Sequence, residues 1–132
     1  MSNHGNVTEA ELASAAVAPR VTDDAAEQNI ASEHYFTAAD GVIGEANSRS
    51  ELVESYPSSL GLLTICVLVL KNGFTIVGQS ACASPLNFNK EFGQRLARTD
   101  AKGKIWAFMG YELRSKLQRE ATEPQASKEE QA

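Results

Sequence analysis

The feature that most constrains this chain is a tight turn between two β-rich runs. LLTICVLVL precedes a Lys-Asn-Gly tripeptide at 71–73, and FTIVGQSACA follows it. Asn-Gly between two such runs is the strongest short-range signal for a β-hairpin, because a type I′ turn needs positive φ at both central residues. The sequence therefore predicts an antiparallel hairpin whose loop is Asn72-Gly73.

That turn also predicts the state of the two cysteines. With a two-residue loop, Val69 faces Ile76 and Cys66 faces Gln79. Cys82 is then some three positions out of register with Cys66, which is too far for a disulfide. The chain has no CxxC motif and no His-rich cluster that would suggest zinc. We expect two free thiols and no metal site.

The first strand of the hairpin is apolar on both faces, since every residue from 65 to 70 is apolar. A strand of this kind is covered on both sides, and a two-stranded sheet is marginal on its own. A chain of 132 residues has material for one helical layer and little more. We therefore expect further copies of the chain to cover the second face, in a homo-oligomer.

The remaining sequence predicts an α+β fold in one domain. The domain is expected over residues 21–119, between a disordered arm at 1–20 and a disordered tail at 120–132. Thr22 is a good N-cap and two acids follow it, so a helix is expected from Thr22 to about His34. Residues 37–59 are rich in Gly, Asn and Ser and are expected to form a loop.

A long apolar helix is predicted after the hairpin. Asn87 or Asn89 can cap it, and apolar residues recur mostly at four-residue intervals from about 88 to 117. Glycines at 103 and 110 weaken the helix. We expect either one bent helix or two helices that meet near Met109-Gly110.

Charge is unevenly distributed along the chain. The formal net charge is -5, yet residues 84–119 hold eight basic residues against three acidic ones. Arg95, Arg98 and Lys102 share one helix face, and Arg114 lies one turn from Gln118. Guanidinium groups suit phosphate. The alternatives are a solvated amphipathic helix, or bases that neutralise acidic neighbours in the same chain or in a partner subunit.

Catalytic motifs are poorly represented. His4 lies in the expected arm, and His34 has no Ser or Cys at a readable spacing. No P-loop, strand-linked GxGxxG, HExxH or EF-hand loop occurs. No run of about 18 apolar residues predicts a membrane span, and the N-terminus lacks a signal-peptide core. We expect a cytosolic protein that is not an enzyme and needs no cofactor.

Four motifs over residues 60–118 resemble a family of short tailed-phage proteins. In order they are TICVLVLKNGFTIVGQSAC, S-P-x-N-F-N-x-E-x-G, A-x-x-D-A-x-x-K-I-W and G-Y-x-L-R-x-x-L. The family is similar in turn to the first type of Thoeris anti-defence protein. That resemblance implies an oligomer, commonly a hexamer, in the cytoplasm of the host bacterium. Such an oligomer would sequester cyclic ADP-ribose signals, and in some cases cyclic di- or trinucleotides, without cleaving them.

The resemblance and the helix faces together define a set of candidate ligand-binding residues. The matching motifs imply contacts from the helix start and from the polar residues that follow it. An acid at 100, where some relatives carry Asn, would repel phosphate but can bind a ribose hydroxyl or an adenine amine. The candidates are Phe88, Asn89, Arg95, Arg98, Asp100, Lys104, Tyr111, Arg114 and Gln118.

A second hypothesis involves no small ligand. The chain would bind a host or phage protein, or take part in phage assembly. The acidic total disfavours DNA or RNA as the partner, because non-specific binding depends on neutralising phosphates.

Overall fold

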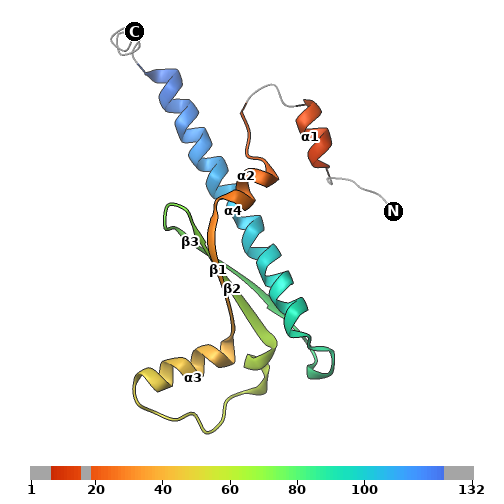
Figure 1. Cartoon of the computed structure of the whole chain (residues 1–132), viewed down its shortest axis with the longest axis vertical. Coiled ribbons are helices and arrows are strands. Elements are labelled where there is room, and N and C mark those ends of the chain that lie inside the picture. The colour runs from red at the N-terminus through yellow and green to blue at the C-terminus, as the bar shows by residue number, and fades with distance from the viewer. Residues whose placement is uncertain (1–6, 16–18, 124–132) are drawn as a thin grey trace.

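The computed structural model describes residues 7–15 and 19–123 as an α+β fold in two layers (Figure 1). One layer is a three-stranded antiparallel sheet, and the other is the helix α4 (Lys90–Thr122). The predicted fold class is confirmed. The expected disordered segments lie in part at 1–6, 16–18 and 124–132, outside the described residues. Within the described part, α1 (Glu9–Ala15) is helical, and α4 continues past position 120, where the tail was expected to begin.

The sheet has the order β1-β2-β3, and its first strand was predicted as helix. Thr22 does cap a helix, accepting a hydrogen bond from Ala25 N at 3.0 Å, but this helix, α2 (Asp23–Gln28), is short. Residues Ile30–Thr37 form β1, which pairs with β2 (Leu63–Leu70). Pairing with an apolar central strand outweighs the weak local preference for helix.

The hairpin between β2 and β3 (Thr75–Ala81) is confirmed, but its register is one residue from the prediction. Cys66 pairs with Gly78 rather than Gln79. The loop has three residues, because Leu70 N–H donates to the Phe74 carbonyl at 2.8 Å and Gly73 has φ of 88°. This is a turn followed by a left-handed glycine, the usual three-residue hairpin. Both cysteines are free, as predicted.

A helix interrupts the segment that was expected to be a loop at 37–59. α3 (Ala38–Ser48) begins with a capping box, in which Thr37 Oγ1 accepts from Asp40 N and Asp40 Oδ2 accepts from Thr37 N. These two bonds satisfy helix-start donors, and the helix forms despite its glycines. The short 3₁₀ helix η1 (Ser58–Leu62) leads into β2. The loop prediction holds only for residues between α3 and η1.

The long C-terminal helix α4 is continuous through Gly103 and Gly110, so the two-helix alternative is wrong. Asn89 caps it, accepting from Phe92 N at 3.0 Å. A short 3₁₀ helix, η2 (Pro85–Asn87), connects β3 to this cap. α4 lies across β2 and β3 and passes beyond the sheet at its C-terminal end (Figure 1).

The packed stripe of α4 consists of Ala97, Ala101 and Ile105, which are fully buried. Phe92 and Leu96, expected on the same stripe, are instead 57% and 61% exposed. The step of five residues from 96 to 101 turns the helix by about 140°, which carries the earlier residues away from the sheet.

Close contact between α4 and β3 depends on one glycine. A Cβ at Gly78 would lie 2.3 Å from Ala101 N and from the Ala97 carbonyl oxygen. Only glycine fits here, because the helix backbone lies directly on the strand. The A-x-x-x-A spacing at 97–101 is therefore a packing signature.

The opposite face of the sheet has no helical layer among the described residues (Figure 1). It carries the half-buried side chains of Ile65, Val67 and Val69. Their strand partners Val77 and Phe36 are 48% and 37% exposed. The prediction that one helix layer covers one face only is confirmed. Oligomerisation, which would cover the other face, stays a prediction.

Candidate ligand-binding site

The N-terminal end of α4 borders a cavity of about 220 Å³. It lies where η2 and the cap of α4 meet the ends of β2 and β3. Two of the predicted site residues, Phe88 and Asn89, line it. Phe92 and Leu96 complete the apolar wall. The first turn of a helix presents free backbone N–H groups and the positive end of the helix dipole, so this end of the cavity favours an anion.

The wall of this cavity contains a buried hydroxyl without a partner. Thr64 is 3% exposed, and its Oγ1 forms no hydrogen bond among the described residues. It lies under the first turns of α4, where a Cβ at Gly93 would come within 2.7 Å of it. Buried hydroxyls are normally hydrogen-bonded, so this hydroxyl, covered by the backbone at Gly93, is an exception to the usual pairing.

Arg95 lies beside a neighbouring hollow and not in the cavity itself. It lines an adjoining hollow of about 410 Å³ with Phe92, Leu96 and Thr99. Its guanidinium carbon lies 5.9 Å from the Phe92 ring centroid, within cation–π range. No carboxylate among the described residues pairs with it. Phe88 and Asn89 thus line one hollow and Arg95 lines the next, and the two hollows share Phe92 and Leu96.

Arg98, three residues further, is differently placed. Its Nε donates to Glu33 at 2.9 Å, and its Nη2 forms a short ion pair with Glu27. Lys102 extends this network, with its Nζ 3.0 Å from Asp23 and 2.9 Å from Glu27. These bonds join α4 to α2 and β1. For Arg98 and Lys102, the alternative that basic residues neutralise acids of the same chain is correct.

The network shifts the pKa values of Glu27, Glu33 and Arg98. Hydrogen bonds from Arg98, and then from Lys102, lower the pKa of Glu27 to about 2. The hydrogen bond from Arg98 also lowers the pKa of Glu33. The carboxylates in turn raise the pKa of Arg98. These shifts keep Glu27, Glu33 and Arg98 charged at neutral pH, so Arg98 is engaged within the chain.

Asp100 and Lys104 lie at the outer edge of β3. Gln79 N–H donates to Asp100 Oδ2 at 2.9 Å, and Lys104 Nζ donates to the Val77 carbonyl at 2.5 Å. The two side chains are themselves 3.7 Å apart. They satisfy backbone groups that an edge strand otherwise leaves unpaired. Asp100 and Lys104 of the D-A-x-x-K motif therefore hydrogen-bond α4 to β3, a role that was not predicted from the sequence.

Tyr111, Arg114 and Gln118 lie in the C-terminal half of α4. Tyr111 is 76% exposed, and Arg114 Nη2 donates to Gln118 Oε1 at 3.1 Å. With 1.5 Å of rise per residue, Arg114 lies roughly 33 Å along the helix from Phe92. One small ligand cannot touch both groups within a single chain.

Sequence reasoning missed Phe92 and Leu96 as site residues, because both fitted an apolar stripe. The signal that could have separated them is the five-residue step before Ala101. Neither hollow is lined by a His, Asp or Glu side chain. Across residues 7–15 and 19–123, no three His, Cys, Asp or Glu side chains gather closely enough to hold a metal ion.

Comparison with known proteins gives one match. The model of the Phage protein (N4 Gp49/phage Sf6 gene 66) family matches residues 21–117. Neither the curated proteins nor the solved structures contain a chain of significant similarity. The matched range runs from the segment before α2 to the C-terminal half of α4, and it includes every candidate residue except Gln118.

Proposed function

The chain belongs to this family of phage proteins, and on that premise we propose that it binds a cyclic nucleotide and holds it without cleaving it. The ligand class is the cyclic ADP-ribose type, with cyclic di- or trinucleotides as the related possibility. The protein acts in the cytoplasm of the host bacterium, where it removes an immune signal from solution.

The observation that carries the proposal is the composition of the cavity at the start of α4. Its helix-start N–H groups, and the guanidinium of Arg95 in the adjoining hollow, suit phosphate oxygens. The Phe88 and Phe92 rings offer stacking surfaces for a base. Phosphate and base are the two parts that every cyclic nucleotide shares.

Sequestration without cleavage is supported by what lines the cavity. Hydrolysis of a phosphate or glycosidic bond needs a general base or an activated nucleophile in reach. The residues that line the two hollows provide no imidazole or carboxylate. Cys82 also lies at the wall, but its Sγ donates to the Ser84 carbonyl at 3.1 Å, within its own loop.

The proposed binding unit is a homo-oligomer, with a hexamer favoured by the resemblance. The open sheet face, with Val77 half exposed at its edge, supports burial against another subunit. The distance between the two groups on α4 gives a second reason. Tyr111, Arg114 and Gln118 of one subunit can complete a site only if that subunit meets the α4 start of another.

Retention of ligand tests the proposal directly. Purified protein is incubated with cyclic ADP-ribose isomers and cyclic dinucleotides, washed, and heated, and the released compounds are identified by mass spectrometry. We expect at least one intact cyclic nucleotide to be recovered. Recovery of none, or of hydrolysed product alone, would contradict the proposal.

A matched pair of variants locates the site. Arg95→Ala removes an uncommitted guanidinium in the adjoining hollow and should weaken binding by roughly tenfold or more. Arg49→Ala removes the same charge at the end of α3, where Arg49 pairs with Glu45 and lines neither hollow, and should change affinity little. Equal losses in both variants would mean that only net charge matters.

A second candidate function rests on the open sheet face. Val77 and Phe36, both over a third exposed, suit a protein partner from the phage or its host. Detection of the protein in purified virions, with no nucleotide retained, would favour this function. Val77→Lys should then abolish incorporation into the virion.

A further inference from the structure

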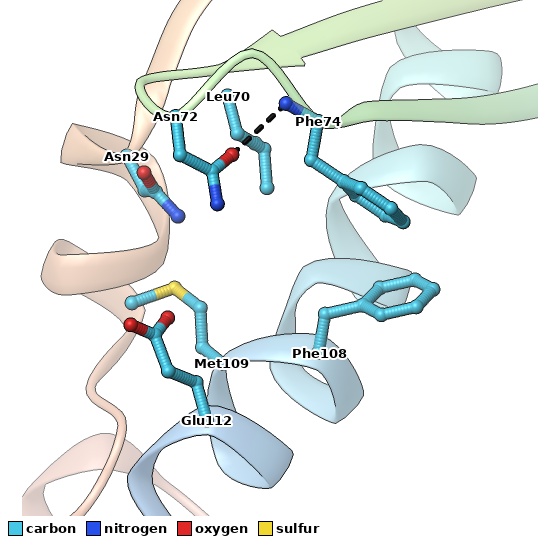
Figure 2. Close-up of a pocket in the computed structure, with 7 residues that line it drawn as sticks. All are labelled: Asn29, Leu70, Asn72, Phe74, Phe108, Met109 and Glu112. Atoms are coloured by element: carbon cyan, nitrogen blue, oxygen red, sulfur yellow. Dashed lines mark hydrogen bonds between the residues drawn. The ribbon is translucent and has the colours of Figure 1, made fainter. Parts of the chain in front are cut away.

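A second cavity lies at the other end of the sheet, beside the tip of the β2–β3 hairpin (Figure 2). It encloses about 250 Å³ between the end of α2, the hairpin turn and the middle of α4. Small-molecule pockets usually begin at about 300 Å³, so this cavity suits a single flat group better than a whole nucleotide. None of the residues that line it belongs to the candidate set above.

Two amide groups point into this cavity from one side (Figure 2). Asn72 Oδ1 accepts from Phe74 N at 2.9 Å, so its oxygen is fixed in the turn and its NH2 group faces the cavity. Asn29 Oδ1 lies 3.4 Å from Lys71 N, a longer contact beside the 3.0 Å hydrogen bond that Lys71 N–H donates to the Asn29 backbone carbonyl. Neither NH2 group has an acceptor among the described residues. The cavity therefore receives hydrogen-bond donors from both amides.

The side opposite the amides carries an acceptor. The Glu112 carboxylate rises from α4 beside Met109 (Figure 2). Its oxygens accept no hydrogen bond and form no ion pair within the described part of the chain. Two acceptor atoms and two donor groups thus line one small cavity, with the Met109 side chain between them in the view of Figure 2.

The remaining walls are apolar and partly aromatic. Leu70 is 4% exposed, and the Phe74 and Phe108 rings stand with centroids 4.9 Å apart. Both rings are about half exposed, at 47% and 48%. Apolar and aromatic walls with a few placed polar groups are typical of small-molecule pockets.

We propose that this hairpin cavity binds a guanine base. The N1–H and N2–H2 groups of guanine are adjacent donors that match the two oxygens of Glu112. Its O6 and N7 atoms are adjacent acceptors that match the Asn29 and Asn72 amides. Adenine and cytosine each present one amino donor beside an acceptor, and uracil one N–H between two acceptors, so none matches this set.

The pattern also predicts that phosphate contributes little here. No Lys or Arg lines the cavity, and Glu112 brings negative charge. Guanosine and its 5′-monophosphate should therefore bind alike. The inference does not depend on the proposed function, because it rests on different residues at the opposite end of the sheet.

Titration calorimetry with nucleoside monophosphates tests it. GMP should bind more tightly than IMP, which lacks only the N2 amine, by roughly tenfold or more, and AMP should bind more weakly still. Equal affinity for GMP, IMP and AMP would overturn the proposal. So would the absence of GMP binding at millimolar concentration.

Three variants locate the binding on these residues. Glu112→Gln should remove the preference for GMP over IMP, whereas Glu120→Gln, on the same helix, should keep it. Asn72→Asp retains the oxygen that accepts from Phe74 N and replaces the donor with an acceptor. It should weaken GMP binding while circular dichroism and the melting temperature stay close to those of the parent. Unchanged affinity in Glu112→Gln or in a folded Asn72→Asp would overturn the proposal.

The Arg95→Ala variant separates this inference from the proposed function. It should lose affinity for cyclic nucleotides at the start of α4 and keep its preference for GMP over IMP. Loss of all GMP binding in Arg95→Ala would overturn the guanine site and leave the proposed function standing. A retained GMP preference, with no cyclic nucleotide retained by the parent protein, would support the guanine site and count against the proposed function.

Discussion

Two faces of the helix α4 hold similar residues, but one face is packed and paired with the rest of the fold and the other is exposed. The inward face and its flanks are joined to the fold: Ala101 lies on Gly78, and Arg98 pairs with acids of α2 and β1. The outward face carries Arg95, Gly103 and Tyr111, which are exposed. Arg95 and Arg98 are only three positions apart. Residue type and spacing did not separate them, because the difference comes from which partners the tertiary fold brings near.

Substituting a glycine at the packed face of α4 and one at its exposed face should give the largest difference in the free energy of unfolding. Gly78→Ala would place a Cβ against the α4 backbone, and we expect a loss of about 3 kcal/mol or more in the free energy of unfolding. Gly103→Ala meets open space within a helix and should stabilise by about 0.5–1 kcal/mol. Urea denaturation measures both. A Gly78→Ala protein as stable as the parent would mean that α4 does not lie on β3 as described.

The second largest difference in stability should be between substitutions of Arg98 and of Arg95. Arg98→Ala leaves Glu27 and Glu33 without their main partner and should cost about 1–2 kcal/mol, less than for a buried pair because both acids are about 40% exposed. Arg95→Ala should change stability by less than about 0.5 kcal/mol. Ligand affinity should show the reverse order. Equal stability losses from the two substitutions would contradict the division of α4 into two faces.

Acid should weaken the inward network and leave the outward face unaffected. The pKa of Glu27 falls from its ordinary 4.5 to about 2 in the folded protein. Its contribution to stability is complete above about pH 5 and is lost as the pH falls towards 2, since the unfolded chain takes up the proton first.

After allowance for exposure, that loss should be about 1 kcal/mol. The same denaturation series in Glu27→Gln should lack this part of the pH dependence, while Glu91→Gln, at the exposed start of α4, should retain it. A parent protein whose stability does not fall between pH 5 and 2 would contradict the assigned pKa.

Much of the fold followed from local sequence signals. The hairpin at Asn72-Gly73 and the caps at Thr22 and Asn89 were predictable, because turns and caps are decided by a few adjacent residues. The capping box at Thr37 and Asp40 was visible in the sequence too, but the glycines nearby favoured a loop. The one-residue register error arose because Asn-Gly also fits the last two positions of a three-residue loop.

Other features depended on contacts between distant segments. Residues 30–37 form a strand because β2 is available to pair with them, and no local sequence signal predicts that pairing. The assignments of Arg98 to Glu27 and of Asp100 to Gln79 N span many residues in sequence. The nine candidate residues therefore fall into three groups of three: those at the start of α4, those that bond to other parts of the fold, and those in the C-terminal half of α4.

The most direct test of the central claim is native mass spectrometry of the protein after incubation with cyclic ADP-ribose isomers. We expect an oligomer that gains the mass of intact ligand, and an Arg95→Ala oligomer that does not. A parent protein that stays monomeric, with its mass unchanged by any of the isomers, would contradict it.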